Sequence, residues 1–195
     1  MKIERVYREI LFQLLEKKKN FFSQKKLAEE CGISIGSVNH ALKPLESMGA
    51  IEKKHMGFRV LDAKKMLLYW ASVRKLQRDV VYQTHSDAPV EEIEKSMPEV
   101  VFTAYSGYKM LFRSVPSDYG EVYVYGDEHI AERFPLKKGK PNVIVLRMDE
   151  HLRKFKSVPM AQLFADLWNI NTWYAQEFLK ALEAKIDEHI KRVLG

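Results

Sequence analysis

Residues 23–54 read SQKKLAEECGISIGSVNHALKPLESMGAIEKK, and this stretch decides how the N-terminal part of the chain folds. Its second half contains apolar residues at the i, i+3, i+4, i+7 spacing of an amphipathic helix. These residues are Ile35, Val38, Ala41, Leu42 and Leu45. Small polar residues stand between them. The pattern predicts a helix that packs by one face and leaves the other face available to another molecule.

Capping residues divide the stretch into two helices. Ser23 is placed to accept hydrogen bonds from the first turn of a short helix, which Cys31-Gly32 ends. Ser34 caps the second helix, and Met48-Gly49 ends it. Pro44 lies inside this second helix. Because proline lacks an N–H, we expect it to bend the helix rather than abolish it.

The flanking residues complete a small domain. Residues 2–18 carry a broad apolar stripe, which predicts a first helix. Residues 51–61, IEKKHMGFRVL, predict two short strands around a turn that contains glycine. The predicted order is therefore helix, helix, turn, helix and a basic hairpin.

This order resembles the winged helix-turn-helix domain of many bacterial and archaeal transcription regulators. The resemblance covers residues 1–62 and is most specific between Leu27 and Lys54, in LAEECGIS and VNHALKPLESMGAIEKK. It implies that the second helix of the motif enters the major groove of DNA. The hairpin, or wing, would then contact the phosphate backbone or the adjacent minor groove.

The polar and basic side chains of these elements are the expected DNA contacts. Base edges in the major groove are read by side chains that are polar and not bulky, and phosphates attract cations and helix N-termini. Solvated, functionless surfaces are the alternative interpretation. We expect Ser37, Asn39 and His40 to contact bases and Lys43 to contact a phosphate. The predicted DNA-binding residues are Ser23, Gln24, Lys25, Ser34, Gly36, Ser37, Asn39, His40, Lys43, Lys53, Lys54, His55 and Arg59.

Charge and composition agree with a polyanionic partner without identifying it. The 195 residues carry a formal charge of +6, and 46% of them are hydrophobic, which is enough for packed cores. Residues 1–62 hold 12 Lys and Arg against 8 Asp and Glu, so the basic excess is concentrated there. The single cysteine, Cys31, has an apolar context typical of a buried thiol. Charges interrupt the apolar residues of the N-terminus, so we expect a cytoplasmic protein without a membrane segment.

The remainder of the chain predicts a connector and a second domain. Asp62 opens a helix over residues 63–82, and Thr84–Pro89 breaks it. Beyond it, predicted strands alternate with helices, which suggests a small mixed domain. The predicted strands are 100–104, 121–125 and 142–146, and the predicted helices are 89–97, 105–112, 127–134, 159–168 and 172–194. We expect Phe164, Leu167, Trp168, Trp173, Phe178 and Leu182 to belong to the core.

A search for catalytic patterns in the second domain gives no support for an enzyme. Nucleotide-binding, hydrolase and zinc-protease motifs are missing from the sequence, and so is any cysteine and histidine spacing for a metal. The acidic pairs Asp127-Glu128 and Asp149-Glu150 adjoin predicted turns, where capping explains them better than metal binding. We therefore expect no cofactor. A nucleotide or other small molecule near Tyr105–Tyr108 and Tyr123–Asp127 stays open as an alternative.

A second resemblance is looser. The runs EVVFTAYSGYKMLF, GEVYVYGDE, NVIVL and VPMAQLFADLWNINTWYAQEFLKALEAKI, in residues 99–190, look similar to the C-terminal region of regulators related to the type IV abortive-infection (AbiEi-type) antitoxins. It implies a non-catalytic domain that modulates operator binding or holds a partner. No functional residue follows from it.

Together these patterns predict an α+β protein with three parts. A winged helix-turn-helix domain occupies residues 1–62, a connector helix 63–84, and a mixed α/β regulatory or partner-binding domain 85–195. The predicted function is sequence-specific regulation of transcription, on double-stranded DNA and as a homodimer. The alternative is an antitoxin-like protein that binds a partner and whose DNA binding serves autoregulation. The operator, the effector and the direction of regulation stay open.

Overall fold

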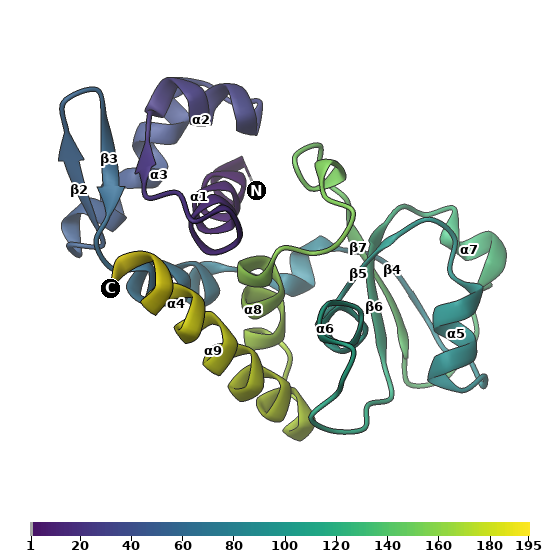
Figure 1. Cartoon of the computed structure of the whole chain (residues 1–195). Helices are drawn as coiled ribbons and strands as arrows, with labels where there is room; N and C mark the ends of the chain where they lie inside the picture. Colours follow the sequence, from purple (N-terminus) through teal and green to yellow (C-terminus); the bar gives the residue numbers. More distant parts are fainter. Residues whose placement is uncertain (1) are drawn as a thin grey trace. The chain divides into compact units, whose positions relative to one another are not determined.

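The structure is a computed structural model that describes residues 2–195 (Figure 1). The chain divides into two compact units. The first unit holds the residues up to Arg74 together with Pro159–Ala165 and Leu182–Gly195. The second unit holds Lys75–Val158 and Asp166–Ala181. The chain is mixed helix and sheet, as predicted.

Helices form most of the first unit. They are α1 (Lys2–Lys17), α2 (Gln24–Cys31), α3 (Ile35–Ser47) and α4 (Ala63–Val73). The predicted caps are confirmed, because the hydroxyl of Ser23 accepts from the amide of Lys26 and that of Ser34 from the amide of Ser37, at 3.3 and 3.1 Å. Gly32 ends α2 at φ +62°, a left-handed conformation that glycine adopts without a steric penalty.

The apolar stripe of α1 is the centre of the first unit. Val6, Ile10, Leu11 and Leu14 are fully buried, and α1 packs against α2, α3 and α4. The buried thiol of Cys31 donates a hydrogen bond to the Arg5 carbonyl oxygen at 3.4 Å. The expectation of a buried cysteine is therefore confirmed.

A three-stranded antiparallel sheet completes the first unit. Its order is β1-β3-β2, with β1 at Phe21–Phe22, β2 at Ile51–Lys54 and β3 at Gly57–Val60. The predicted hairpin is confirmed, but its turn consists of His55 and Met56, and Gly57 belongs to β3. A Cβ atom on Gly57 would lie 2.3 Å from the carbonyl oxygen of Phe22. Glycine is needed there because β1, which the sequence did not predict, approaches so closely.

The predicted helix 63–82 is wrong in its second half. Helix α4 ends at Val73, a 3₁₀ turn follows at Leu76–Asp79, and Val80–Thr84 forms strand β4. Strand β4 pairs with β7, which lies far along the chain. This pairing decides the conformation of Val80, Val81 and Thr84, whose β-branched side chains suit a strand, although the local spacing predicts a helix. The expected connector 63–84 is thus helical only at its start. The functional domain limits at 62 and 84 stay a prediction.

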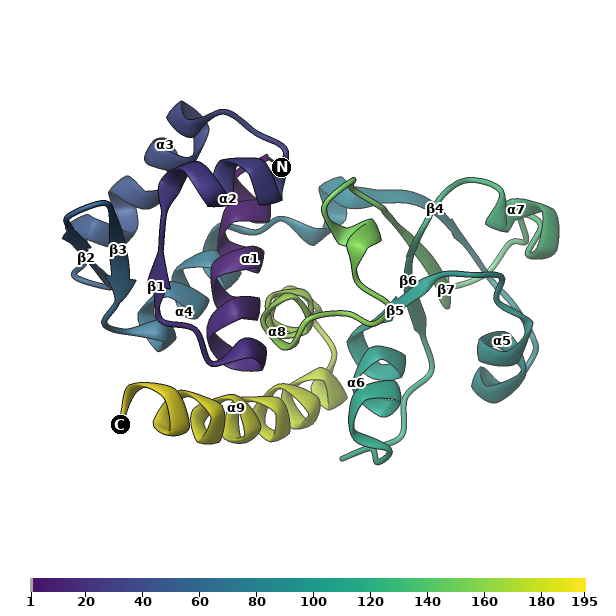
Figure 2. The ribbon, with the colours of Figure 1, turned by 45° about the horizontal axis from the view of Figure 1, so that its top comes forward.

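The second unit is built on a four-stranded sheet of order β4-β7-β6-β5. Strands β6 and β7 are parallel, and the β4–β7 and β5–β6 pairs are antiparallel. Helices α5 and α7 lie on one face of this sheet and α6 lies on the other (Figures 1 and 2). The remaining elements are β5 (Val101–Thr103), β6 (Val122–Gly126), β7 (Val143–Arg147), α5 (Val90–Ser96), α6 (Ala104–Phe112) and α7 (Ile130–Arg133).

Alternation along the strands gives the sheet two buried faces. Val122 and Val124 of β6 and Val143 and Val145 of β7 pack into one apolar cluster with residues of α5 and α7. On the opposite face, the hydroxyls of Thr103 and Tyr125 both donate to the buried carboxylate of Asp166, at 2.7 and 2.6 Å. Both faces are therefore covered, as in a three-layer arrangement.

The last two helices, α8 (Met160–Trp168) and α9 (Trp173–Leu194), contribute residues to both units. Phe164, Leu167, Phe178 and Leu182 are buried as predicted. The expectation that both tryptophans are core residues is wrong, because Trp168 is 44% exposed and Trp173 is 74% exposed. Trp168 ends α8, and Trp173 starts α9 outside the buried stripe that begins at Ala175.

Candidate nucleic-acid interface

Helix α3 has one packed face and one open face. Val38, Ala41, Leu42 and Leu45 are buried at the helical spacing that the sequence predicted. Ile35, which was expected on the same face, is 46% exposed, so the buried stripe starts at Val38. The predicted contact residues Gly36, Asn39, His40 and Lys43 are all exposed, and Ser37 is partly buried.

Three side chains on the open face of α3 have no partner within the described chain. No hydrogen bond or ion pair engages the amide of Asn39, the imidazole of His40 or the ammonium group of Lys43 there. Their hydrogen-bonding groups are therefore free to meet another molecule. An amide can form the paired hydrogen bonds that adenine presents in the major groove, and an ammonium group suits a phosphate.

The serines at the start of α3 are partly committed to the helix itself. The hydroxyl oxygen of Ser34 accepts from the Ser37 amide, and the two hydroxyls lie 2.9 Å apart. Gly36, between them, has open space around it, since the nearest atom to an added Cβ would be the Ser34 hydroxyl oxygen at 3.8 Å. Packing inside the unit thus gives no reason for a glycine at this exposed helical position.

Pro44 does not abolish the helix. Helix α3 continues through it to Ser47, and the amide of Met48 donates to the Pro44 carbonyl oxygen at 3.1 Å. The hydroxyl of Ser47 donates to the Lys43 carbonyl oxygen at 3.0 Å. The last turn is therefore hydrogen bonded despite the missing N–H.

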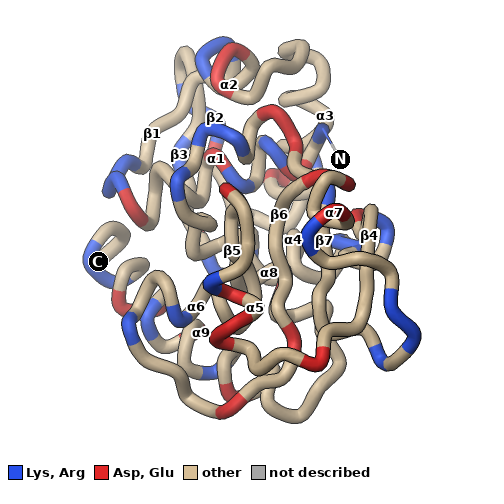
Figure 3. Tube along the Cα trace, turned by 90° about the vertical axis from the view of Figure 1, so that its right-hand side faces the viewer, with Lys and Arg blue, Asp and Glu red and all other residues tan. Residues whose placement is uncertain are grey.

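The β2–β3 hairpin carries basic residues along its strands (Figure 3). These cations differ in their intramolecular partners. Lys53 pairs with Glu46 at 2.6 Å and Lys54 pairs with Glu52 at 2.8 Å. Arg59 is exposed and has no ion-pair partner among the described residues. Exposed pairs contribute little free energy, so a phosphate can compete for either lysine.

The tip of the hairpin carries a residue that the sequence reasoning missed. Met56 follows His55 in the two-residue turn, is 81% exposed and has a φ of +67°. Positive φ is unfavourable for a side chain larger than glycine or asparagine. An apolar residue at a predicted turn, between basic strands, is the signal that could have drawn attention to it.

The start of α2 is the third predicted contact region. Ser23 and Gln24 are partly buried, and Lys25 is exposed with no ion-pair partner among the described residues. Lys25 and Ser34 border the same shallow hollow, of about 570 Å³. The structure thus brings together the starts of α2 and α3, two predicted contact segments that are separate in the sequence.

The first acid of each acidic pair in the second unit accepts a backbone hydrogen bond at a turn. The prediction that Asp127 caps α7 is wrong, because the N-cap residue of α7 is His129, which makes no side-chain cap hydrogen bond. A carboxylate oxygen of Asp127 accepts from the amide of His129 at 3.1 Å, and one of Asp149 accepts from the amide of Leu152 at 2.8 Å. Across residues 2–195, no three His, Cys, Asp or Glu side chains gather as metal ligands would. None of the helices in that range combines the length and apolar character needed to cross a bilayer.

Comparison with protein families supports the interpretation of the first unit. Residues 8–52 match the family described as winged helix-turn-helix DNA-binding. The match runs from α1 to the second residue of β2, so it contains α2 and α3 entirely. The N-terminal part of the chain is therefore a winged helix-turn-helix domain of a DNA-binding kind. Such a domain indicates a regulator rather than an enzyme.

The other comparisons do not extend this result. No curated protein and no solved structure matches the chain. The likeness of residues 99–190 to AbiEi-type antitoxin regulators stays a prediction.

Proposed function

We propose that the protein is a sequence-specific transcriptional regulator that places α3 in the major groove of DNA. One observation carries this proposal: Asn39, His40 and Lys43 form an exposed face without partners in the described chain, opposite the packed face of α3. Other exposed helices have polar faces too. This one lies in a domain that matches a DNA-binding family.

The proposed contacts divide into base contacts and phosphate contacts. Asn39 and His40, with Ser37, face base edges, because amide, imidazole and hydroxyl groups distinguish donors from acceptors. Lys43 and Lys25 are proposed phosphate contacts, as are the remaining predicted residues near the start of α2. These contacts fix the orientation of α3 and carry no sequence information.

The wing is the second proposed contact region. Lys53, Lys54, His55 and Arg59 are exposed and contact the backbone or the adjacent minor groove in this proposal. Met56 at the tip would lie against the groove wall, where apolar side chains are used as wedges. Its location at a positive-φ position supports a role outside packing.

We also propose that the protein acts as a homodimer. One short helix reads only a few base pairs, and specific affinity usually comes from two half-sites about one helical turn apart. Selection of binding sites from random duplex DNA, at several salt concentrations, tests both proposals together. We expect an enriched inverted repeat whose affinity falls steeply with salt. A selected pool without sequence enrichment would contradict specific recognition, and an enriched single half-site would contradict the dimer.

A second candidate function is an antitoxin-like protein that holds a partner protein. The exposed indoles of Trp173 and Trp168 favour it, because tryptophan is enriched at the centres of protein interfaces. In this case a stoichiometric partner copurifies with the wild-type chain and is lost from Trp173→Ala. Leu136→Ala is the control, because Leu136 is an apolar residue that is 81% exposed, compared with 74% for Trp173.

A further inference from the structure

A depression in the second unit lies at one edge of its sheet. Because β6 and β7 are parallel, their carboxyl ends meet there, and Gly126 is paired with Arg147 in the register. The antiparallel neighbours start at this edge, with Val80 paired to Leu146 and Val101 paired to Tyr125. Ligands of open α/β sheets commonly bind at such a carboxyl edge.

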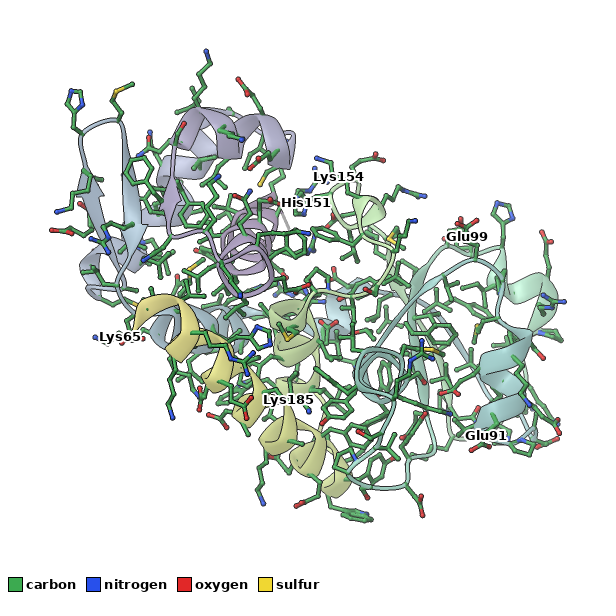
Figure 4. The ribbon with its side chains drawn as sticks, in the orientation of Figure 1. Lys65, Glu91, Glu99, His151, Lys154 and Lys185 are labelled. Carbon is green, nitrogen blue, oxygen red and sulfur yellow. The ribbon has the colours of Figure 1, made fainter. Side chains whose placement is uncertain are left out.

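The depression consists of three neighbouring hollows that share lining residues. Their volumes are about 710, 410 and 750 Å³, and Met148 and Arg153 line all three. The size is in the range of sites for small organic molecules. Figure 4 labels Glu99, ahead of β5, and Lys154, in the 3₁₀ turn after β7, which both border it. The three hollows therefore lie next to one another at this edge.

Two guanidinium groups border the depression without a carboxylate partner. Arg147 ends β7 and Arg153 lies in the 3₁₀ turn Leu152–Lys154, and both are exposed. No ion pair or side-chain hydrogen bond engages either group within the described residues. An arginine fork binds a carboxylate or a phosphate through two parallel hydrogen bonds.

Apolar side chains lie next to these cations. Val81, Val100, Ile130 and Met148 line the hollows. The chain at Gly126 passes close to this wall, since an added Cβ would lie 2.7 Å from the Cδ1 atom of Ile130. A ligand with an apolar body can therefore rest on this wall while its anionic group meets the arginines.

Acidic residues near α7 restrict the kind of anion. Asp127, Glu128 and Glu132 line this side, and His129 hydrogen bonds to Glu132 at 3.3 Å. That hydrogen bond, together with the Asp127 carboxylate, raises the pKa of His129. A long polyanion such as nucleic acid would meet these carboxylates and be repelled, whereas a small molecule with one anionic group can reach the arginines alone.

We propose that this depression is a binding site for a small organic anion, which carries one carboxylate or phosphate group and an apolar body. Arg147 and Arg153 bind the anionic group, and Met148 with its apolar neighbours contacts the body. The proposal is independent of DNA binding. Its test contains no DNA, so its failure would leave the proposed regulator function untouched.

Titration calorimetry with three probes tests the proposal on the full chain. The probes are benzoate, phenyl phosphate and uncharged benzamide. We expect saturable binding of at least one anion with a dissociation constant of about 1 mM or tighter, as small probes of this size allow. Benzamide should bind about tenfold or more weakly. The two anions distinguish a carboxylate ligand from a phosphate ligand.

Substitutions and a local reporter place the binding event. Arg153→Gln should weaken binding of the anion about tenfold or more. Arg147→Gln should also weaken it, because each substitution removes a charged hydrogen-bond donor. Arg78→Gln is the matched control, since Arg78 is exposed in the same unit and lines none of the hollows. In spectra of methyl-labelled methionine, the Met148 signal should shift on titration and that of Met56 should not.

Two results would overturn the proposal. One is the absence of saturable binding for both anions in folded protein, verified by its thermal melting curve. The other is binding that Arg147→Gln and Arg153→Gln leave unchanged, or that shifts methionine signals without moving that of Met148.

Discussion

The first unit uses its polar side chains in two opposite ways. Glu4 and Arg74 are each 3% exposed and form a buried ion pair, and the Trp70 indole donates to the same Glu4 carboxylate at 3.3 Å. Asn39 and Lys43 are exposed and have no side-chain partner in the described chain. Burial of a charge is costly unless a partner compensates it, so the first set belongs to the fold. The second set has unused hydrogen-bonding capacity, which is what recognition of another molecule requires.

The largest effect is expected at the buried pair. Arg74→Met should lower the free energy of unfolding by about 3–5 kcal/mol, because it removes a charged partner of the buried Glu4 carboxylate. Urea unfolding measures the change. The double variant Glu4→Gln/Arg74→Met should recover much of the loss, since it removes both charges and keeps an acceptor for Trp70. If Arg74→Met were as stable as the wild type, the buried pair would not be a part of the fold that differs from the exposed face of α3.

The next effect concerns specificity rather than stability. Asn39→Ala should reduce discrimination between the selected site and its single-base variants by about 1–3 kcal/mol at one position. Its unfolding free energy should change by less than about 0.5 kcal/mol, because the side chain is exposed. Competition binding assays on a panel of duplexes measure the first quantity. Equal weakening on every sequence would contradict a base contact.

A smaller effect is expected at the wing, where charge is partly compensated. Lys54→Ala should weaken binding to all duplexes alike and reduce the slope of log K against log salt by about 0.9. Glu52→Gln is the converse test, because it frees Lys54 from its 2.8 Å pair and removes a charge that repels phosphate. It should strengthen binding to all duplexes. Affinity changes of opposite sign for Lys54→Ala and Glu52→Gln would support a phosphate contact at Lys54. Affinity changes of the same sign would contradict it.

Local signals explain why the first unit could be predicted in detail. The caps of Ser23 and Ser34 act on amides within one turn, so the limits of α2 and α3 are encoded where they occur. Strand β1 has no such signal, since its two residues become a strand only by pairing with β3. Strand β4 is a similar case, because its partner β7 lies about sixty residues further along the chain.

The two candidate sites also differ in whether local sequence or pairing between distant segments forms them. The open face of α3 follows from helical periodicity, so Asn39, His40 and Lys43 could be identified from the sequence as an exposed set. The depression at the sheet edge depends on the register that pairs Gly126 with Arg147. Sequence reasoning noted Asp127 as part of an alternative small-molecule site, yet placed Tyr105 beside it, and that ring is buried in the core. Nothing local encodes which strand ends meet.

The smallest expected effect tests why α3 has a glycine in its first turn. Gly36→Ala should raise the unfolding free energy by up to about 1 kcal/mol, because alanine restricts the unfolded chain and the site has room for a methyl group. In the proposed complex the start of α3 approaches the DNA, so the same methyl group should weaken binding. Thermal unfolding measures the change in stability and duplex binding measures the change in affinity, both on one preparation. A stabilised variant with unchanged affinity would mean that this glycine faces only solvent, and the contact surface of α3 would then start at Asn39.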